Sequence, residues 1–170
     1  MASDHADRIV EEWRRERPDL GVAALGTVAR LFRTVHVADG ILAERLAGLG
    51  LQPGWFDLLA ALRRSGHPYA LNPTQLMQAT MLSSGGMTKR LDRLADAGLV
   101  ERQPDPSDRR GTLVKLTRKG KATVDRALEE HVANEELLLR SLSPADRRLL
   151  DGLLRTLLLD LETRTAASPA

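Results

Sequence analysis

Apolar residues recur at helical spacing through the first third of the chain and predict three helices. A short amphipathic stretch predicts a helix over Ala6 to about Arg15, which Pro18 prevents from continuing. A longer apolar stripe predicts a second helix from near Leu20 to about Gly48. A third helix is predicted over Trp55–Arg64, so this part of the chain is expected to be helical almost throughout.

The next segment predicts two short helices joined by a tight turn. Asn72 can cap the first of them, which runs to about Met81. Ser83 or Ser84 is the expected cap of the second, which ends at Gly98. Two short helices separated by such a turn are typical of a helix-turn-helix.

After these helices the pattern changes to that of a β-hairpin, a wing beside the helix-turn-helix. Leu99–Gln103 and Thr112–Leu116 are the predicted strands, and Pro104–Gly111 is the predicted loop. A helix then runs from Thr117 to about Leu142.

Ser143-Pro144 starts a last helix that is rich in leucine, and the tail Ala166–Ala170 is expected to be disordered. This helix carries more apolar surface than one small domain can cover, which favours association with a second copy. The predicted fold is mainly α, a single domain over 1–170 that contains a winged helix-turn-helix with a two-stranded wing.

The composition of the chain argues against several classes of function. The chain has 25 basic and 23 acidic side chains, and a net charge of +2 does not by itself indicate a nucleic-acid partner. There is no cysteine, the four histidines are dispersed, and no nucleophile motif occurs. We therefore expect no enzyme, no metal site and no cofactor. A charged N-terminus and the lack of long apolar runs predict a cytoplasmic protein without membrane contact.

The second helix of the predicted helix-turn-helix has two faces. At about 100° per residue, Met87, Leu91 and Leu94 point in one direction. The residues that point roughly the opposite way are Gly85, Lys89, Asp92 and Arg93. The small residues before this helix leave backbone N–H groups free to approach phosphates and base edges. This arrangement predicts a recognition helix for the major groove of double-stranded DNA.

The predicted loop Pro104–Gly111 places Arg109 and Arg110 at the tip of the wing, where they could enter a minor groove, and Asp108 could hold one of them. Alone, such a charge run is more often a solvated surface, but a preceding helix-turn-helix favours DNA. The candidate DNA contacts are Thr74, Gln75, Ser83, Ser84, Gly85, Thr88, Lys89, Arg93, Asp108, Arg109 and Arg110.

The helix-turn-helix followed by GLVERQPDPSDRRGTLVKLTRKG resembles the MarR family of bacterial transcription regulators across essentially the whole chain. Asp108-x-Arg110 followed by Leu116-Thr117 is the most specific part of the resemblance. It implies a homodimer whose dimerisation helices, over 20–48 and 117–165, interleave with those of the partner. The winged helix-turn-helix over 55–116 would then read a pseudo-palindromic operator as a repressor, with an extra N-terminal helix over 4–17.

Four features together resemble the urate-responsive (PecS-like) branch of that family: an N-terminal helix with tryptophan, WFDLLAALRRSGHPY, SSGGMTKRLDRL and GLVER. The resemblance implies that a urate response depends on Trp13, Asp57, Arg90 and Arg102. Arg90 lies about 60° from Met87 around its helix, so it borders the buried face and needs a polar or anionic partner. Urate is a planar monoanion that an arginine fork can bind.

In the resulting hypothesis, urate enters between the dimerisation helices and the winged domain, contacts Arg90 and Arg102, repels Asp57 and releases DNA. Each residue also has a structural alternative. Trp13 can anchor its helix by burying its indole, Asp57 can complement a helix dipole, and Arg102 can be solvated or contact a phosphate. The alternative functions are a ligand-independent DNA-binding regulator and a sensor of another small anion or a phenolic compound.

Overall fold

The computed structural model describes residues 3–80, 86–106 and 108–167. These residues form seven helices and a three-stranded antiparallel sheet. The chain divides into two compact units, residues 1–131 and 132–170, and α6 crosses the boundary between them.

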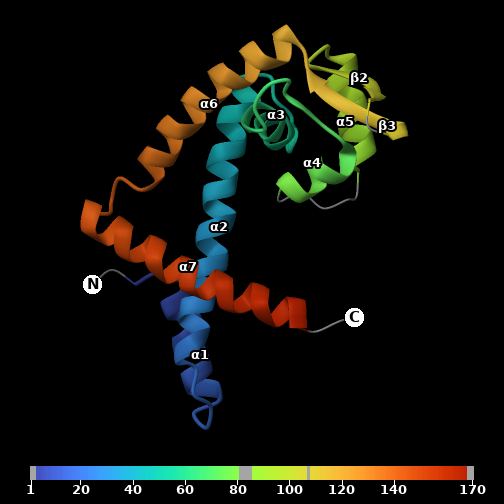
Figure 1. The fold of residues 1–170 in the computed structure, drawn as a ribbon. Helices are drawn as coiled ribbons and strands as arrows, with labels where there is room; N and C mark the ends of the chain where they lie inside the picture. The colour runs from blue at the N-terminus through green and yellow to red at the C-terminus, as the bar shows by residue number, and fades with distance from the viewer. Residues whose placement is uncertain (1–2, 81–85, 107, 168–170) are drawn as a thin grey trace. The chain divides into compact units, whose positions relative to one another are not determined.

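The first unit begins with two helices that pack together, α1 (His5–Glu16) and α2 (Ala23–Gly48) (Figure 1). Asp4 caps α1 by accepting a hydrogen bond from the backbone N–H of Asp7 at 2.9 Å. Arg30 of α2 donates from Nε to Asp4 Oδ2 at 2.7 Å and also pairs with Asp7. Ion pairs therefore fix α1 against the N-terminal part of α2.

The segment that we call the winged lobe, residues 55–116, contains three helices and the sheet. Its elements are α3 (Trp55–Arg64), β1 (Ala70–Leu71), α4 (Pro73–Ala79), α5 (Met87–Asp96), β2 (Val100–Asp105) and β3 (Asp108–Leu116). The strand order is β1-β3-β2, and both pairings are antiparallel. The longest pairing, β2 with β3, forms the wing.

A single apolar core holds the winged lobe together and extends to α6 (Arg118–Leu138). Leu58 and Leu62 of α3, Leu94 of α5 and Val124 of α6 have no exposed surface. A polar contact adds to this packing, because Asp125 of α6 accepts from Arg63 Nε of α3 at 2.7 Å and from Lys121 Nζ at 2.9 Å. These two cations, Lys121 first, lower the pKa of the Asp125 carboxyl group.

The second unit consists of the rest of α6 and α7 (Pro144–Ala167). Ser143 caps α7, since its Oγ accepts from the backbone N–H of Asp146 at 3.2 Å. No residue of α7 is buried, although the helix is rich in leucine.

Local signals predicted several boundaries correctly. The helix over Trp55–Arg64 has the predicted bounds. Asn72 and Gln75 form a capping box at the start of α4. Gly98 follows the last turn of α5 with a φ of 68°, a left-handed conformation that glycine adopts without strain.

The predicted cap of α5 was wrong. The helix begins at Met87, and its N-cap is Gly86 at a φ of 80°, not Ser83 or Ser84, which lie outside the described residues. The preceding helix ends at Ala79 instead of Met81, because Thr80 is already extended. A left-handed glycine, and not a serine side chain, therefore sets the start of α5.

The wing also differs from its prediction. β1, a third strand of only two residues, pairs with Lys115 and Val114 of β3 and was not predicted. Most of the predicted loop Pro104–Gly111 belongs to the two wing strands, which pair as far as Asp105 and Asp108. Their distal residues are mainly polar, so no apolar alternation marked them as strands.

At the C-terminal end, α6 stops at Leu138 and not near Leu142. The predicted disordered tail starts too early, because α7 continues to Ala167 and only residues 168–170 lie outside the described part.

Candidate DNA-binding and ligand-binding site

Helix α5 presents one buried and one exposed face. Met87, Leu91 and Leu94 are at most 5% exposed and anchor the helix in the core. Thr88, Lys89 and Arg93 are exposed on the side away from it. Core packing therefore fixes the orientation of a basic face, as the helical periodicity of about 100° per residue predicted.

Helix α4 precedes α5 and carries two further candidates, Thr74 and Gln75, both exposed in its first turn. Gln75 Oε1 accepts a hydrogen bond from the backbone N–H of Asn72 at 2.9 Å. The carbonyl end of this side chain is thus used in the capping box, while its NH₂ group remains a donor for a phosphate or a base.

The wing candidates Asp108, Arg109 and Arg110 lie at the start of β3. Asp108 is exposed and faces Asp105 across the hairpin. The remaining candidates, Ser83, Ser84 and Gly85, lie outside the described residues.

An ion pair connects α5 to the wing. Arg102 of β2 places Nη2 2.8 Å from Asp92 Oδ1 of α5, and both side chains are partly exposed. Arg93, the next residue of α5, donates from Nη1 to Gln52 Oε1 at 3.4 Å. The outward side of α5 is therefore tied to the wing through Asp92 and to the loop before α3 through Arg93.

Of the four ligand candidates, three lie in the winged lobe. Asp57 is exposed in the first turn of α3 and makes no ion pair within the described part of the chain. Arg90 is half-buried, and its Nη1 lies 3.3 Å from where a Cβ on Gly86 would be. Arg102 is held by Asp92.

Trp13, the fourth ligand candidate, is 46% exposed on α1. Helix α1 is fixed near Arg30, whereas Leu46, later in α2, packs against the core. At 1.5 Å per residue these two positions are about 24 Å apart along the helix axis. The structure thus does not bring Trp13 to the other three candidates within one chain.

The contacts of two residues at this site were not predicted. Helical periodicity placed Asp92 on the outward face of α5, but it did not predict the ion pair with Arg102, which lies on β2. Gln52, the partner of Arg93, gives no sequence signal at all. The one sequence signal for the Asp92–Arg102 ion pair is the position of Asp92, a carboxylate on a face that otherwise carries cations.

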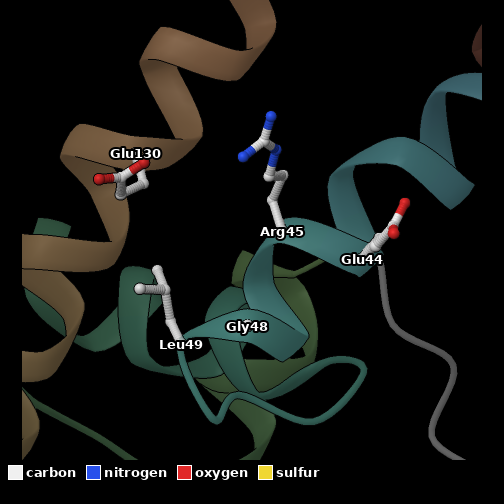
Figure 2. A pocket seen from close by; sticks show the side chains of 5 residues that line it. All are labelled: Glu44, Arg45, Gly48, Leu49 and Glu130. Carbon is white, nitrogen blue, oxygen red and sulfur yellow. The ribbon is translucent and has the colours of Figure 1, made fainter.

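A pocket of about 470 Å³ lies between the end of α2 and α6 (Figure 2). Glu44, Arg45, Gly48, Leu49 and Glu130 line it. Two carboxylates and one guanidinium give its lining a net negative charge, which disfavours an anion, and none of the four ligand candidates lines it.

Within the described residues, no group of three or more His, Asp or Glu side chains could hold a metal ion. The same part of the chain contains no helix long and apolar enough to cross a bilayer.

Residues 49–111 match the MarR family. The chain is 40% identical to the HTH-type transcriptional regulator PecS of Dickeya dadantii (strain 3937), over 86% of this chain and 88% of PecS. A crystal structure of a MarR mutant from E. coli complexed with operator DNA superposes with a TM-score of 0.68 at 27% identity, covering 92% of this chain and 99% of that chain. A structure of Bordetella bronchiseptica BpsR that describes the mechanism for regulation of its DNA binding by 6-hydroxynicotinic acid superposes with a TM-score of 0.67 at 28% identity. The match covers 75% of this chain and 89% of BpsR.

The winged helix-turn-helix and these matches define a DNA-binding transcription regulator and not an enzyme. The chain belongs to the MarR family, and its similarity to PecS extends over most of its length.

Proposed function

We propose that this regulator is a homodimeric repressor that binds a pseudo-palindromic operator and is released by a small anion such as urate. The observation that carries the DNA part is the fixed basic face of α5, with Thr88, Lys89 and Arg93 exposed opposite a buried apolar face. In this proposal α5 enters the major groove while the wing arginines Arg109 and Arg110 approach the adjacent minor groove. The remaining proposed contacts with DNA come from Ser83, Ser84, Gly85, Thr74, Gln75 and Asp108.

Exposed leucine side chains support the homodimer. Leu149, Leu153 and Leu159 of α7 are 63%, 60% and 59% exposed, and Phe32 of α2 is 70% exposed. So much apolar surface on two long helices is typical of an interface between subunits. A two-fold pair of winged lobes would then match the two halves of a pseudo-palindrome.

The proposed urate site consists of Asp57, Arg90 and Arg102, and a contribution of Trp13 has to come from the second protomer. Because Asp92 already neutralises Arg102, urate would compete with Asp92 for this guanidinium. Breaking that pair uncouples the wing from the recognition helix. Release of DNA requires only that urate prefers the uncoupled state, and each tenfold preference contributes about 1.4 kcal/mol.

A second candidate signal is a small aromatic acid. The relative BpsR, whose DNA binding is regulated by 6-hydroxynicotinic acid, favours this alternative. It would use the same cationic residues, since a carboxylate and urate both accept hydrogen bonds from an arginine fork.

The test follows fluorescence anisotropy of the labelled DNA upstream of this gene, bound by the protein at fixed salt, while urate is added. Loss of binding with urate, and a blunted response in Arg102→Gln and Arg90→Ala variants that still bind DNA, is the expected result. An exposed arginine of α2, Arg33→Gln, serves as the control. Tight binding that urate does not change would reject urate and leave the regulator.

A further inference from the structure

The C-terminal end of α5 and the N-terminal end of α6 meet at the base of the wing, where β2 begins and β3 ends (Figure 1). At the end of α5, the Leu94 carbonyl accepts from the Leu99 N–H at 2.9 Å and the Ala95 carbonyl accepts from the Gly98 N–H at 2.8 Å. These are the hydrogen bonds of an ordinary helix end at a left-handed glycine. The carbonyl groups of residues 97–99 need partners from other segments.

The start of α6 supplies a partner for each of these three carbonyl groups. Thr117 Oγ1 donates to the Gly98 carbonyl at 2.8 Å and shares its hydrogen with the Leu99 carbonyl at 3.2 Å. The Thr117 backbone N–H donates to the Leu99 carbonyl at 3.1 Å, and Lys119 Nζ donates to the Ala97 carbonyl at 2.8 Å. Thr117 and Lys119 therefore join α6 to the C-terminal end of α5.

The Thr117 hydroxyl group is also the N-cap of α6. Its oxygen accepts from the backbone N–H of Gly120 at 2.9 Å, and Thr117 directly precedes the helix. One hydroxyl group thus donates to the end of α5 and accepts from the start of α6. A Cβ on Gly120 would lie 1.8 Å from the Leu99 carbonyl oxygen, so the two helix ends are in close contact.

Core packing and these hydrogen bonds fix different aspects of α5. Leu91 and Leu94 bury one face of the helix, but apolar packing has little directional preference. Hydrogen bonds are directional, so those at the helix end set the angle between α5 and α6. A change of this angle would displace Lys89 and Arg93, which lie on the exposed face.

We propose that Thr117 is a positioning residue for operator recognition, which holds α5 at a fixed angle to α6 by capping both helices with one hydroxyl group. Lys119 supports the same arrangement through the Ala97 carbonyl. The inference rests on the proposed entry of α5 into the major groove. A loosened α5 still attracts phosphates through its cations, so operator binding should suffer more than binding to unrelated DNA.

Thr117→Asp separates the two capping roles. The carboxylate can still cap α6, because it accepts from the Gly120 N–H and complements the helix dipole. It has no hydrogen to donate, and its charge repels the Gly98 and Leu99 carbonyls. Anisotropy of the labelled DNA upstream of this gene should show about tenfold weaker binding. The affinity for a duplex of unrelated sequence and the salt slope should match those of the parent.

Three further variants complete the experiment. Thr117→Ser keeps both hydrogen-bonding roles and should bind both DNAs as the parent does. Arg118→Gln changes the net charge by the same amount at the next residue, which is exposed, and it should keep the parental ratio of the two affinities. Lys119→Met should weaken operator binding about threefold without lowering the salt slope, because its exposed contact is a weak one. Thermal unfolding verifies the fold of each variant, and Lys119→Met decides if Thr117→Asp does not fold.

Parental preference for operator DNA in folded Thr117→Asp would overturn the assignment, and so would an equal loss in Arg118→Gln, which would make charge the cause. A salt slope lowered by about one in Lys119→Met would place Lys119 at a phosphate instead. Lys89→Ala on the same DNAs tests the exposed face of α5 separately. If Lys89→Ala weakens operator binding and Thr117→Asp does not, the proposed function stands and the positioning role of Thr117 fails.

Discussion

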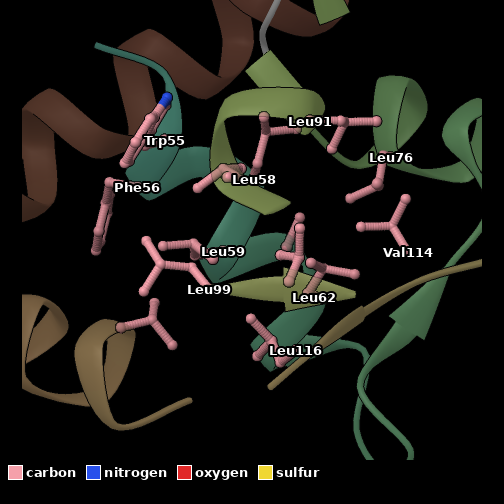
Figure 3. Packing of buried hydrophobic residues seen from close by; sticks show 14 of the residues in the cluster. Trp55, Phe56, Leu58, Leu59, Leu62, Leu76, Leu91, Leu99, Val114 and Leu116 are labelled. Atoms are coloured by element: carbon pink, nitrogen blue, oxygen red, sulfur yellow. The ribbon is translucent and has the colours of Figure 1, made fainter. Parts of the chain in front are cut away.

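The winged lobe and α7 place their leucines in opposite environments. Leu58, Leu59 and Leu62 of α3 have no exposed surface and lie at the centre of a packed cluster (Figure 3). In α7 no residue is buried, and Leu149 and Leu153 are more than half exposed. The apolar side chains of the lobe are covered by one another, whereas those of α7 are exposed within the described residues and are free to contact a second copy of the chain.

This difference separates folding from assembly. Substitutions in the lobe core should lower the stability of the folded chain, while substitutions on the outer face of α7 should weaken association and leave the fold intact. Substitutions of the exposed basic residues on α5 should change neither the stability nor the association of the chain, and they should affect only DNA binding.

The largest expected effect is at Gly120, where α6 crosses the start of the wing. A Cβ at this position would lie 1.8 Å from the Leu99 carbonyl oxygen, which is backbone and has little freedom to move. Gly120→Ala should therefore lower the free energy of unfolding by about 3 kcal/mol or more, measured by urea denaturation. At Gly152 of α7 a Cβ meets nothing within 4 Å, so Gly152→Ala should not destabilise the chain. Unchanged stability of Gly120→Ala would contradict the close packing.

The next effect is on association. Gln in place of both Leu149 and Leu153 removes apolar surface from each protomer, so in a two-fold dimer every change counts twice. We expect dimerisation to weaken about 100-fold or more in sedimentation experiments, with little change in helical content. Arg148→Gln, an exposed polar change on the same helix, is the control. A double variant that remains dimeric would show that α7 is not the interface.

Substitutions on the basic face of α5 should change DNA binding without changing stability or association. Lys89→Ala should reduce operator affinity about tenfold and lower the slope of log affinity against log salt by about one. Its unfolding free energy and its oligomeric state should match those of the parent, because Lys89 is exposed. Anisotropy at several salt concentrations measures both quantities, and an unchanged salt slope would remove Lys89 from the phosphate contacts.

Features encoded by neighbouring residues were predictable, and features that join distant segments were not. The bounds of α3, the Asn72 cap and the glycine after α5 follow from local patterns. Strand β1 has only two residues, and it is defined by its pairing with β3. Its existence depends on a partner more than forty positions away, which no local pattern reveals.

The candidate site shows the same division. The two faces of α5 follow from helical periodicity, and the structure places Lys89 and Arg93 where that periodicity predicted. The Asp92–Arg102 pair joins a helix to a strand and depends on their packing. The separation of Trp13 from Asp57 depends on where α1 docks along α2, and contacts between distant residues, such as the ion pairs of Arg30, set that position.

The Asp92–Arg102 pair should contribute less than the core does to the lobe's stability. Both side chains are partly exposed, and such pairs usually contribute no more than about 1 kcal/mol. In a double-mutant cycle with Asp92→Asn and Arg102→Gln, we expect a coupling energy of about 0.5 kcal/mol that decreases with added salt. Strictly additive unfolding energies at low salt would mean that the two side chains do not interact in solution.

The smallest effect concerns α1, which docks on α2 through the buried side chains of Ala6 and Val10 and through the ion pairs of Arg30. Hydrogen bonds from Arg30 and from the Asp7 backbone N–H lower the pKa of Asp4 below its ordinary value of about 3.9. A lowered pKa in the folded state stabilises α1 docking above that ordinary value, and this contribution is lost as pH falls through the folded-state pKa. Amide hydrogen exchange in α1, taken relative to the intrinsic exchange rate at each pH, should therefore accelerate on acidification below about pH 4, and Asp4→Asn should exchange faster already at neutral pH. Asp19 has a pKa lowered by Arg17 within the following loop, so Asp19→Asn provides a matched carboxylate that does not join α1 to α2. Equal acceleration in both variants would mean that the Arg30 pairing does not hold α1, and its position would then depend on apolar contacts such as Val10 against Gly26.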